Sequence, residues 1–170
     1  EIDPYFSEQP GWAEQHVDYF WSNLCKACDT LWRTWGGPKT AIKAVSVTTQ
    51  RATVINLDAD GEPLRPAIVW LDQRLEQDLP PMGPWGPLLA LAGEKETVRF
   101  FRRQSEALWI KNNQPEIWQK TAKFLLLSGY YSYRLTGEYV YSAASQVGYL
   151  HFDFKKQDGA GRLGCKWLAR

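Results

Sequence analysis

The sequence predicts an α/β domain with a mixed sheet flanked by helices. Two segments rich in β-branched residues, 42–47 and 51–58, precede a glycine-containing turn at residues 59–62, and a short third strand is predicted at 66–70. Stretches with helical periodicity come before and after these strands. Strands and helices that succeed one another in this way are typical of a sheet covered by helices.

The first helix is predicted from residue 12 or 13 to about residue 35. Apolar side chains recur there at intervals of three and four, at Val17, Phe20, Leu24, Ala27, Leu31 and Trp35. Gly36-Gly37-Pro38 ends the pattern.

The remaining elements follow from periodicity and from proline and glycine positions. We expect the first turns of a helix at residues 72–79, a loop at 80–87, and helices at 88–92, 94–112 and 115 to about 134. Residues 139–142 are expected to be extended. The lysines and glycines of residues 154–170 predict a loosely ordered segment.

Charge and composition exclude several classes of protein. The 20 basic and 19 acidic side chains nearly cancel, which gives no field to attract nucleic acid or an anionic membrane. No apolar run approaches the roughly 20 residues of a membrane span. The first residues do not resemble a signal peptide, and the odd number of cysteines favours a reducing compartment, so we expect a cytoplasmic protein. Cys25 and Cys28 lack a second pair of ligands, so no metal site is predicted.

The first candidate site is the polar segment 46–51, which follows a predicted strand. Ligands of open α/β sheets lie beyond the carboxyl ends of strands. Gln50 and Arg51 offer donors that suit sugar hydroxyls. The alternative is a solvated connection between two strands.

The second candidate site places Trp70, Asp72 and Arg74 within five residues at the end of another strand. A ring face, an acceptor and a cation together can hold a polyol, and the chain is 14% aromatic. The alternative is a buried tryptophan beside a helix-capping aspartate and a surface arginine.

Four segments, in order along the chain, resemble the opening domain of the FGGY family of carbohydrate kinases. They are residues 11–15 (GWAEQ), 46–53 (SVTTQRAT), 60–74 (DGEPLRPAIVWLDQR) and 133–138 (YRLTGE). The resemblance covers about residues 5–155, so the whole chain of 170 residues is expected to be part of such an N-terminal domain. It implies a ribonuclease-H-like, actin-like domain that binds a sugar or polyol and pairs with an ATP-binding domain.

The resemblance also implies roles for particular residues. Gln50, Arg51, Ala52 and Trp70 would line the sugar pocket, and Phe101 falls near a position that lines it in glycerol kinases. Those kinases carry an acidic residue where this chain has Ala52, which argues against glycerol as the substrate.

By the same resemblance, the first strand hairpin with its phosphate loop, the catalytic aspartate and the ATP-binding domain lie outside this sequence. We therefore expect no catalytic residue in this chain and no turnover by it alone, whereas the whole protein would use ATP and Mg²⁺. The expected partners are the sugar or polyol and the C-terminal ATP-binding domain. Without the hairpin, exposed strands would favour self-association. The alternatives are a non-catalytic sugar-binding remnant and a structural or interaction domain.

Overall fold

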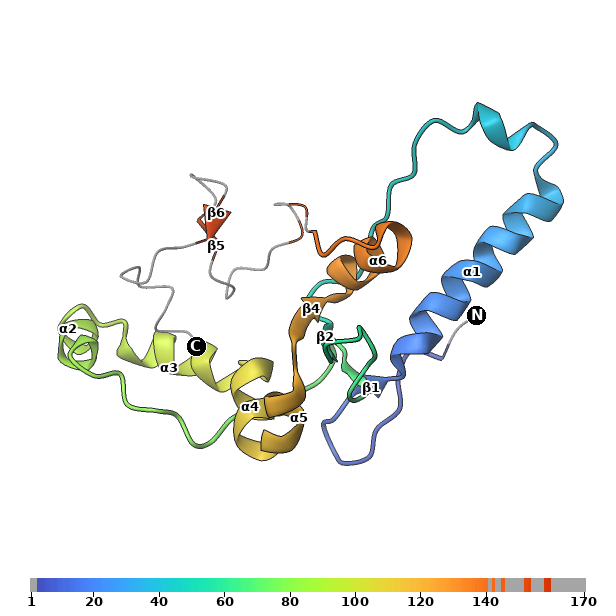
Figure 1. Cartoon of the computed structure of the whole chain (residues 1–170). Coiled ribbons are helices and arrows are strands. Elements are labelled where there is room, and N and C mark those ends of the chain that lie inside the picture. The colour runs from blue at the N-terminus through green and yellow to red at the C-terminus, as the bar shows by residue number, and fades with distance from the viewer. Residues whose placement is uncertain (1–2, 141, 143–144, 146–151, 154–157, 160–170) are drawn as a thin grey trace.

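The computed structural model describes residues 3–140, 142, 145, 152–153 and 158–159. Its centre is a four-stranded sheet of order β1-β3-β2-β4 (Figure 1). The strands are β1 (Glu14–Gln15), β2 (Val54–Leu57), β3 (Ala67–Ile68) and β4 (Lys123–Leu126). A separate pair is formed by β5 (Phe152–Asp153) and β6 (Asp158–Gly159). The α/β fold class is confirmed, although the described strand pairs are all antiparallel rather than mixed.

Six α-helices and one short 3₁₀ helix lie in the described part of the chain. They are α1 (Val17–Thr34), η1 (Lys39–Ala41), α2 (Trp85–Leu91), α3 (Lys95–Arg103), α4 (Glu106–Asn113), α5 (Pro115–Lys120) and α6 (Leu127–Thr136). Local sequence sets their ends. The Ser105 hydroxyl accepts a hydrogen bond from the Leu108 amide at the start of α4, and Gly137 ends α6 in a left-handed conformation with φ 78°.

Side chains on the two faces of the sheet form two separate core clusters. Successive strand residues point to opposite faces, so Ile55 and Leu57 pack with α1 and α6, whereas Val54 packs with α4. The first cluster contains Val17, Ile55, Leu57, Ala67, Leu125, Leu127 and Tyr130, and the second contains Val54, Ile68, Trp109, Ile110 and Leu126. The sheet therefore holds α1 and α6 on one face and α4 on the other.

The strand predicted at residues 42–47 is wrong. This segment has no regular structure, and Val45 is 79% exposed. A β-branched run needs a neighbouring strand and a buried face to become a strand, and no described strand pairs with these residues.

The single helix predicted from residue 115 to about 134 is also wrong. It is divided into α5, β4 and α6. β4 pairs with β2 along its whole length, from Lys123 opposite Leu57 to Leu126 opposite Val54. Burial of Leu125 and Leu126 in the sheet outweighs the helical spacing of the surrounding apolar residues.

Smaller differences concern the remaining helices. Residues 72–79 are not helical, the predicted helix 94–112 is interrupted at residues 104–105, and α2 begins inside the predicted loop 80–87. The helix predicted over 12–35 is confirmed from Val17 onward. The expectation for residues 154–170 falls almost wholly outside the described residues. Across the described part, no helix combines the length and apolar character needed to cross a bilayer.

Candidate functional site

A cavity of about 390 Å³ brings two of the predicted binding residues together. Gln50 and Trp70 both line it, and we call it the Trp70 cavity. Trp70 is separated from the end of β3 by the buried Val69 and is itself 58% exposed. Tyr19 and Asn23 from α1 and Tyr131 from α6 line the same space. The cavity therefore combines aromatic rings with amide groups, a set of side chains that suits a polyhydroxy ligand.

A second cavity, of about 370 Å³, contains Arg51 and is called the Arg51 cavity. Gln50 lines this cavity too, together with hydroxyl-bearing side chains. These are Thr48, Thr49, Ser128, Ser142 and Ser145. The Gln50 side-chain amide donates a hydrogen bond of 2.9 Å to the Thr53 hydroxyl, which fixes it beside both cavities.

Ala52 turns the chain between Arg51 and the buried start of β2. Its φ of 58° lies in the left-handed region, which a non-glycine residue rarely occupies. Ala52 is half-buried and lies next to the Gln50–Arg51 pair in sequence. Gln50, Arg51 and Ala52, which the family resemblance places at the sugar pocket, therefore form one irregular corner of the chain.

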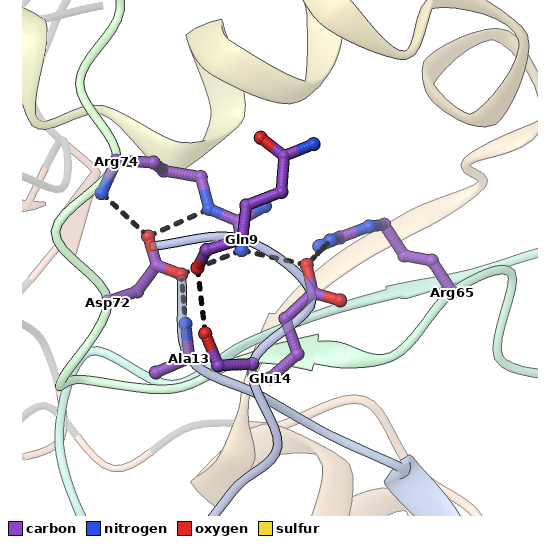
Figure 2. Close-up of polar contacts among 7 residues, drawn as sticks. Gln9, Ala13, Glu14, Arg65, Asp72 and Arg74 are labelled. Atoms are coloured by element: carbon purple, nitrogen blue, oxygen red, sulfur yellow. Dashed lines mark hydrogen bonds and ion pairs between the residues drawn. The ribbon is translucent and has the colours of Figure 1, made fainter. Parts of the chain in front are cut away.

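Asp72 and Arg74 lie in a buried ion cluster (Figure 2). Arg74 donates from Nε and Nη2 to the two Asp72 carboxylate oxygens, each at 2.7 Å. The same Nη2 reaches Glu14 Oε1 at 2.8 Å, and Arg65 pairs with that oxygen too. The side chains of Glu14, Arg65, Asp72 and Arg74 are only 2–5% exposed. We refer to these four residues as the buried ion cluster.

The buried ion cluster ties the segment before β1 to the segment after β3. Asp72 Oδ2 accepts a hydrogen bond of 2.7 Å from the Ala13 amide. The Arg74 guanidinium also lies 4.1 Å from the ring centre of Trp12 and 4.6 Å from that of Trp109. Loss of water on burial lowers the pKa of Arg65, and the charge of Glu14 opposes that shift. This geometry orients the strand end that carries Trp70.

The structure thus separates the predicted site residues into three groups. Gln50, Arg51 and Trp70 line the two cavities, with Ala52 at the adjoining corner. Asp72 and Arg74 lie in the buried ion cluster. Phe101 lies on α3, is 45% exposed and packs against Phe100 with ring centres 5.8 Å apart. It does not line either cavity, and Figure 1 shows α3 on the opposite side of α4 from α1 and α6.

The polar side of α1 was not among the predicted binding residues. Tyr19 and Asn23 are four residues apart, so they share a helix face. The Asn23 side-chain amide donates a hydrogen bond of 2.8 Å to the Tyr19 backbone carbonyl. That spacing was available in the sequence, but the apolar stripe of the same helix dominated the interpretation. Glu14 and Arg65 were missed as well, since only the fold brings them to Arg74.

The described residues offer no obvious metal ligands. No group of three or more His, Cys, Asp or Glu side chains lies together within them in an arrangement that could hold an ion. What this chain presents at the two cavities is hydrogen-bonding and aromatic surface.

Comparison with known proteins identifies the family. Residues 4–158 match the N-terminal domain of the FGGY family of carbohydrate kinases. A glycerol kinase of Thermococcus gammatolerans is 31% identical over 162 residues, which are 91% of this chain and 32% of the relative. A xylulose kinase of Escherichia coli is 28% identical over 151 residues, covering 88% of this chain and 30% of that protein.

Solved structures agree in fold. The ligand-bound xylulose kinase of Lactobacillus acidophilus superimposes with a TM-score of 0.69 at 20% identity, covering 94% of this chain and 32% of that one. The Plasmodium falciparum glycerol kinase with ADP gives a TM-score of 0.65 at 25% identity, covering 93% and 33%. The chain spans about a third of the length of these relatives. By its match over residues 4–158 and its ribonuclease-H-like, actin-like fold, the chain belongs to the FGGY family of carbohydrate kinases.

Proposed function

We propose that this chain supplies the acceptor-binding part of an ATP-dependent kinase that phosphorylates a hydroxyl of a sugar or polyol. The observation that carries the proposal is the Trp70 cavity, where Gln50 and Trp70 meet although they come from separate motifs. Membership of the FGGY family and kinship with glycerol and xylulose kinases support it.

The proposed binding mode uses the side chains at the two cavities. The exposed Trp70 ring would pack against a C–H face of the ligand. Because the Gln50 amide nitrogen donates to Thr53, its carbonyl oxygen stays available to accept from a ligand hydroxyl. Arg51 would donate to hydroxyl oxygens from the adjoining Arg51 cavity.

This chain's contribution to catalysis is to hold and orient the acceptor. Phosphoryl transfer depends mainly on positioning of the reactants and on neutralisation of phosphate charge, which ATP-bound Mg²⁺ would supply in the whole protein. The described residues hold no group of three or more metal-ligating side chains, so we assign none of them to Mg²⁺. The family resemblance places the catalytic aspartate outside this sequence, so we assign none of them as the base. The isolated chain is proposed to bind without turnover.

The residue after Arg51 bears on the choice of acceptor. Ala52 has no hydrogen-bonding group where the family resemblance places an acidic side chain in glycerol kinases. A carboxylate there would accept from a polyol hydroxyl, and its loss removes that contact. We therefore favour a sugar over glycerol as the acceptor.

Tryptophan fluorescence tests the binding step. The chain is titrated with pentuloses, hexuloses, gluconate, erythritol and glycerol, and at least one sugar is expected to change the emission of Trp70. The variant Trp70→Phe should lose that response. Trp85→Phe, on α2 and 40% exposed, is the matched control and should keep it. No response to any compound, or an unchanged response in Trp70→Phe, would contradict the proposal.

A coupled assay of ADP release tests the reaction. The whole protein that contains this chain should release ADP with the sugar that changes Trp70 fluorescence, and the 170-residue chain alone should not. Binding without turnover by the whole protein would favour a non-catalytic sugar-binding module. Absence of both would favour a structural or interaction domain.

A further inference from the structure

A basic cavity lies on α3, apart from the Trp70 and Arg51 cavities. Its volume is about 610 Å³, within the range of small-molecule sites, and we call it the α3 cavity. Four cationic side chains line it, and none of its lining residues is Asp or Glu. The cations are Lys95, Arg99, Arg102 and Arg103.

The sequence of α3 explains why the cations converge. Lys95 is followed by arginines four, seven and eight positions later, which is the spacing of one helix face. Phe100 and Phe101 occupy other positions on this helix and are 57% and 45% exposed. The helix therefore presents a cationic face to the cavity.

The wall of the cavity that faces α3 is formed by residues 77–81, and hydrogen bonds to α3 hold it in place. Arg102 is only 4% exposed, and its Nη2 donates to the Pro80 carbonyl at 2.6 Å. Arg103 Nη2 donates to Gln77 Oε1 at 3.1 Å, and the Arg103 carbonyl accepts from the Glu76 amide at 2.8 Å. These contacts fix the segment that precedes α2 against α3, so both walls of the cavity are held by the fold.

Arg99 and Arg103 have little compensation from nearby acceptors. Arg99 lies 4.0 Å from Glu96, but both side chains are more than half exposed, so solvent screens the pair. Arg103 Nε is buried and has no hydrogen-bond partner among the described residues. A buried guanidinium donor without an acceptor is unfavourable, so the Arg103 side chain keeps unused hydrogen-bonding capacity beside the cavity.

We propose that the α3 cavity binds a sugar phosphate or polyol phosphate, with the phosphate on Arg99 and Arg103. A phosphate monoester carries close to two negative charges at neutral pH and matches the guanidinium fork. The other wall, with Leu79, Pro80 and Pro81, offers apolar surface to the C–H groups of the carbon skeleton. The site shares no lining residue with the Trp70 or Arg51 cavity and does not depend on the proposed kinase reaction.

Binding to the chain is measured by calorimetry with inorganic phosphate, glycerol 3-phosphate and xylulose 5-phosphate, and with glycerol and xylulose as unphosphorylated comparators. At least one of the two esters should bind more tightly than inorganic phosphate. In ¹H–¹⁵N spectra of the arginine side chains, the Nε signal that Arg103→Gln removes should shift with the bound ester.

The variants locate the site. Arg99→Gln and Arg103→Gln should each weaken ester binding about ten-fold, since each removes a charge-assisted hydrogen bond. Arg99 is mostly exposed, so its variant keeps the test valid if Arg103→Gln fails to fold. Arg33→Gln, at the exposed end of α1, is the matched control and should bind as the unaltered chain does.

Wild-type affinity in Arg99→Gln and in any folded Arg103→Gln would overturn the proposal. So would an unphosphorylated comparator that shifts the Arg103 Nε signal as much as the esters do, or binding of inorganic phosphate as tightly as both esters. A failure of sugars to alter Trp70 fluorescence would contradict the proposed kinase function but would leave this site unaffected.

Discussion

Ala52 is the one described non-glycine residue with a positive φ, and it follows the Gln50–Arg51 pair. Left-handed backbone costs an alanine roughly 1–2 kcal/mol. Glycine avoids that cost, but its greater freedom stabilises the unfolded chain by about 0.4–1 kcal/mol. We therefore expect Ala52→Gly to raise the free energy of unfolding by up to about 1 kcal/mol, seen as a higher urea midpoint at unchanged slope.

Two further variants test whether the effect of Ala52→Gly comes from its positive φ. Ala52→Val should lower stability, because a β-branched side chain strongly disfavours positive φ. Ala44→Gly, in the exposed irregular segment before the corner, should be slightly destabilising. If Ala52→Gly destabilised the chain as Ala44→Gly does, the strain at Ala52 would be refuted.

The residue scale also shows what could be predicted of the site. The sequence predicts Gln50 and Trp70 as binding residues, and both line one cavity, although the strand expected before Gln50 does not form. The segment 70–74 could not reveal that Arg74 lies over the rings of Trp12 and Trp109, because the fold brings those rings from two distant segments. An arginine two residues from an aspartate is expected to pair with it both in a binding site and in a buried cluster. Only tertiary packing decides whether a ligand can reach the pair.

The buried ion cluster joins β1 to the chain beyond β3, so its energetics concern whole elements. Arg74→Met would leave the buried Asp72 carboxylate without its cation and remove the contacts to Trp12 and Trp109. Breaking a buried pair in this way costs about 3–5 kcal/mol. We expect a loss of that size in urea unfolding.

A milder variant keeps this prediction testable if Arg74→Met does not fold. Asp72→Asn preserves shape and should lose about 1.5–3 kcal/mol, because it weakens charged hydrogen bonds. Arg33→Met, on the exposed end of α1, should stay within about 0.5 kcal/mol of the unaltered chain. A stability of Arg74→Met equal to that of Arg33→Met would contradict the role given to the cluster.

Tyr130 and Tyr131 on α6, together with Tyr139 just beyond it, make stability sensitive to alkaline pH. Burial raises the pKa of Tyr130, which is fully buried, and of its neighbour Tyr131. Burial and a hydrogen bond to Tyr133 raise the pKa of Tyr139 to about 12. The folded chain therefore holds more protons than the unfolded chain above about pH 10, and its stability falls as pH rises from there toward 12.

Urea unfolding at pH 9, 10 and 11 measures this fall, and absorbance at 295 nm reports phenolate formation. Tyr139→Phe should reduce the dependence of stability on pH above 10 while keeping the fold at neutral pH. A free energy of unfolding that stays constant from pH 9 to 11 would show that these side chains ionise equally well in the folded chain.

At the scale of elements, local pattern predicted some parts and failed at others for a physical reason. The apolar stripe of α1 is local and was predicted correctly from Val17 onward. β4 forms because Phe124 and Leu125 pair with Asn56 and Ile55 on β2, a partner far away in sequence. The segment 42–47 has strand-forming residues but no partner among the described strands. In both cases, the presence or absence of a partner strand, and not the local residue propensity, determined whether a strand formed.

The whole molecule exposes an apolar arm, which we define as residues 31–47. Figure 1 shows the end of α1 and the following segment projecting away from the sheet. Five large apolar side chains of the arm are 36–79% exposed. They are Leu31, Trp35, Ile42, Val45 and Val47. Apolar surface gathered in one segment favours contact with another apolar surface.

We therefore predict that the chain self-associates through the apolar arm. Size-exclusion chromatography at increasing concentration should show a growing apparent mass, because association follows mass action. Val45→Lys should return the chain to a monomer without loss of fold, since Val45 is 79% exposed and a charge there removes apolar contact. Leu91→Lys, 88% exposed on α2, is the matched control and should leave association unchanged. A monomer at every concentration would contradict the prediction. If Val45→Lys and Leu91→Lys reduced association equally, the contact surface would not be the apolar arm.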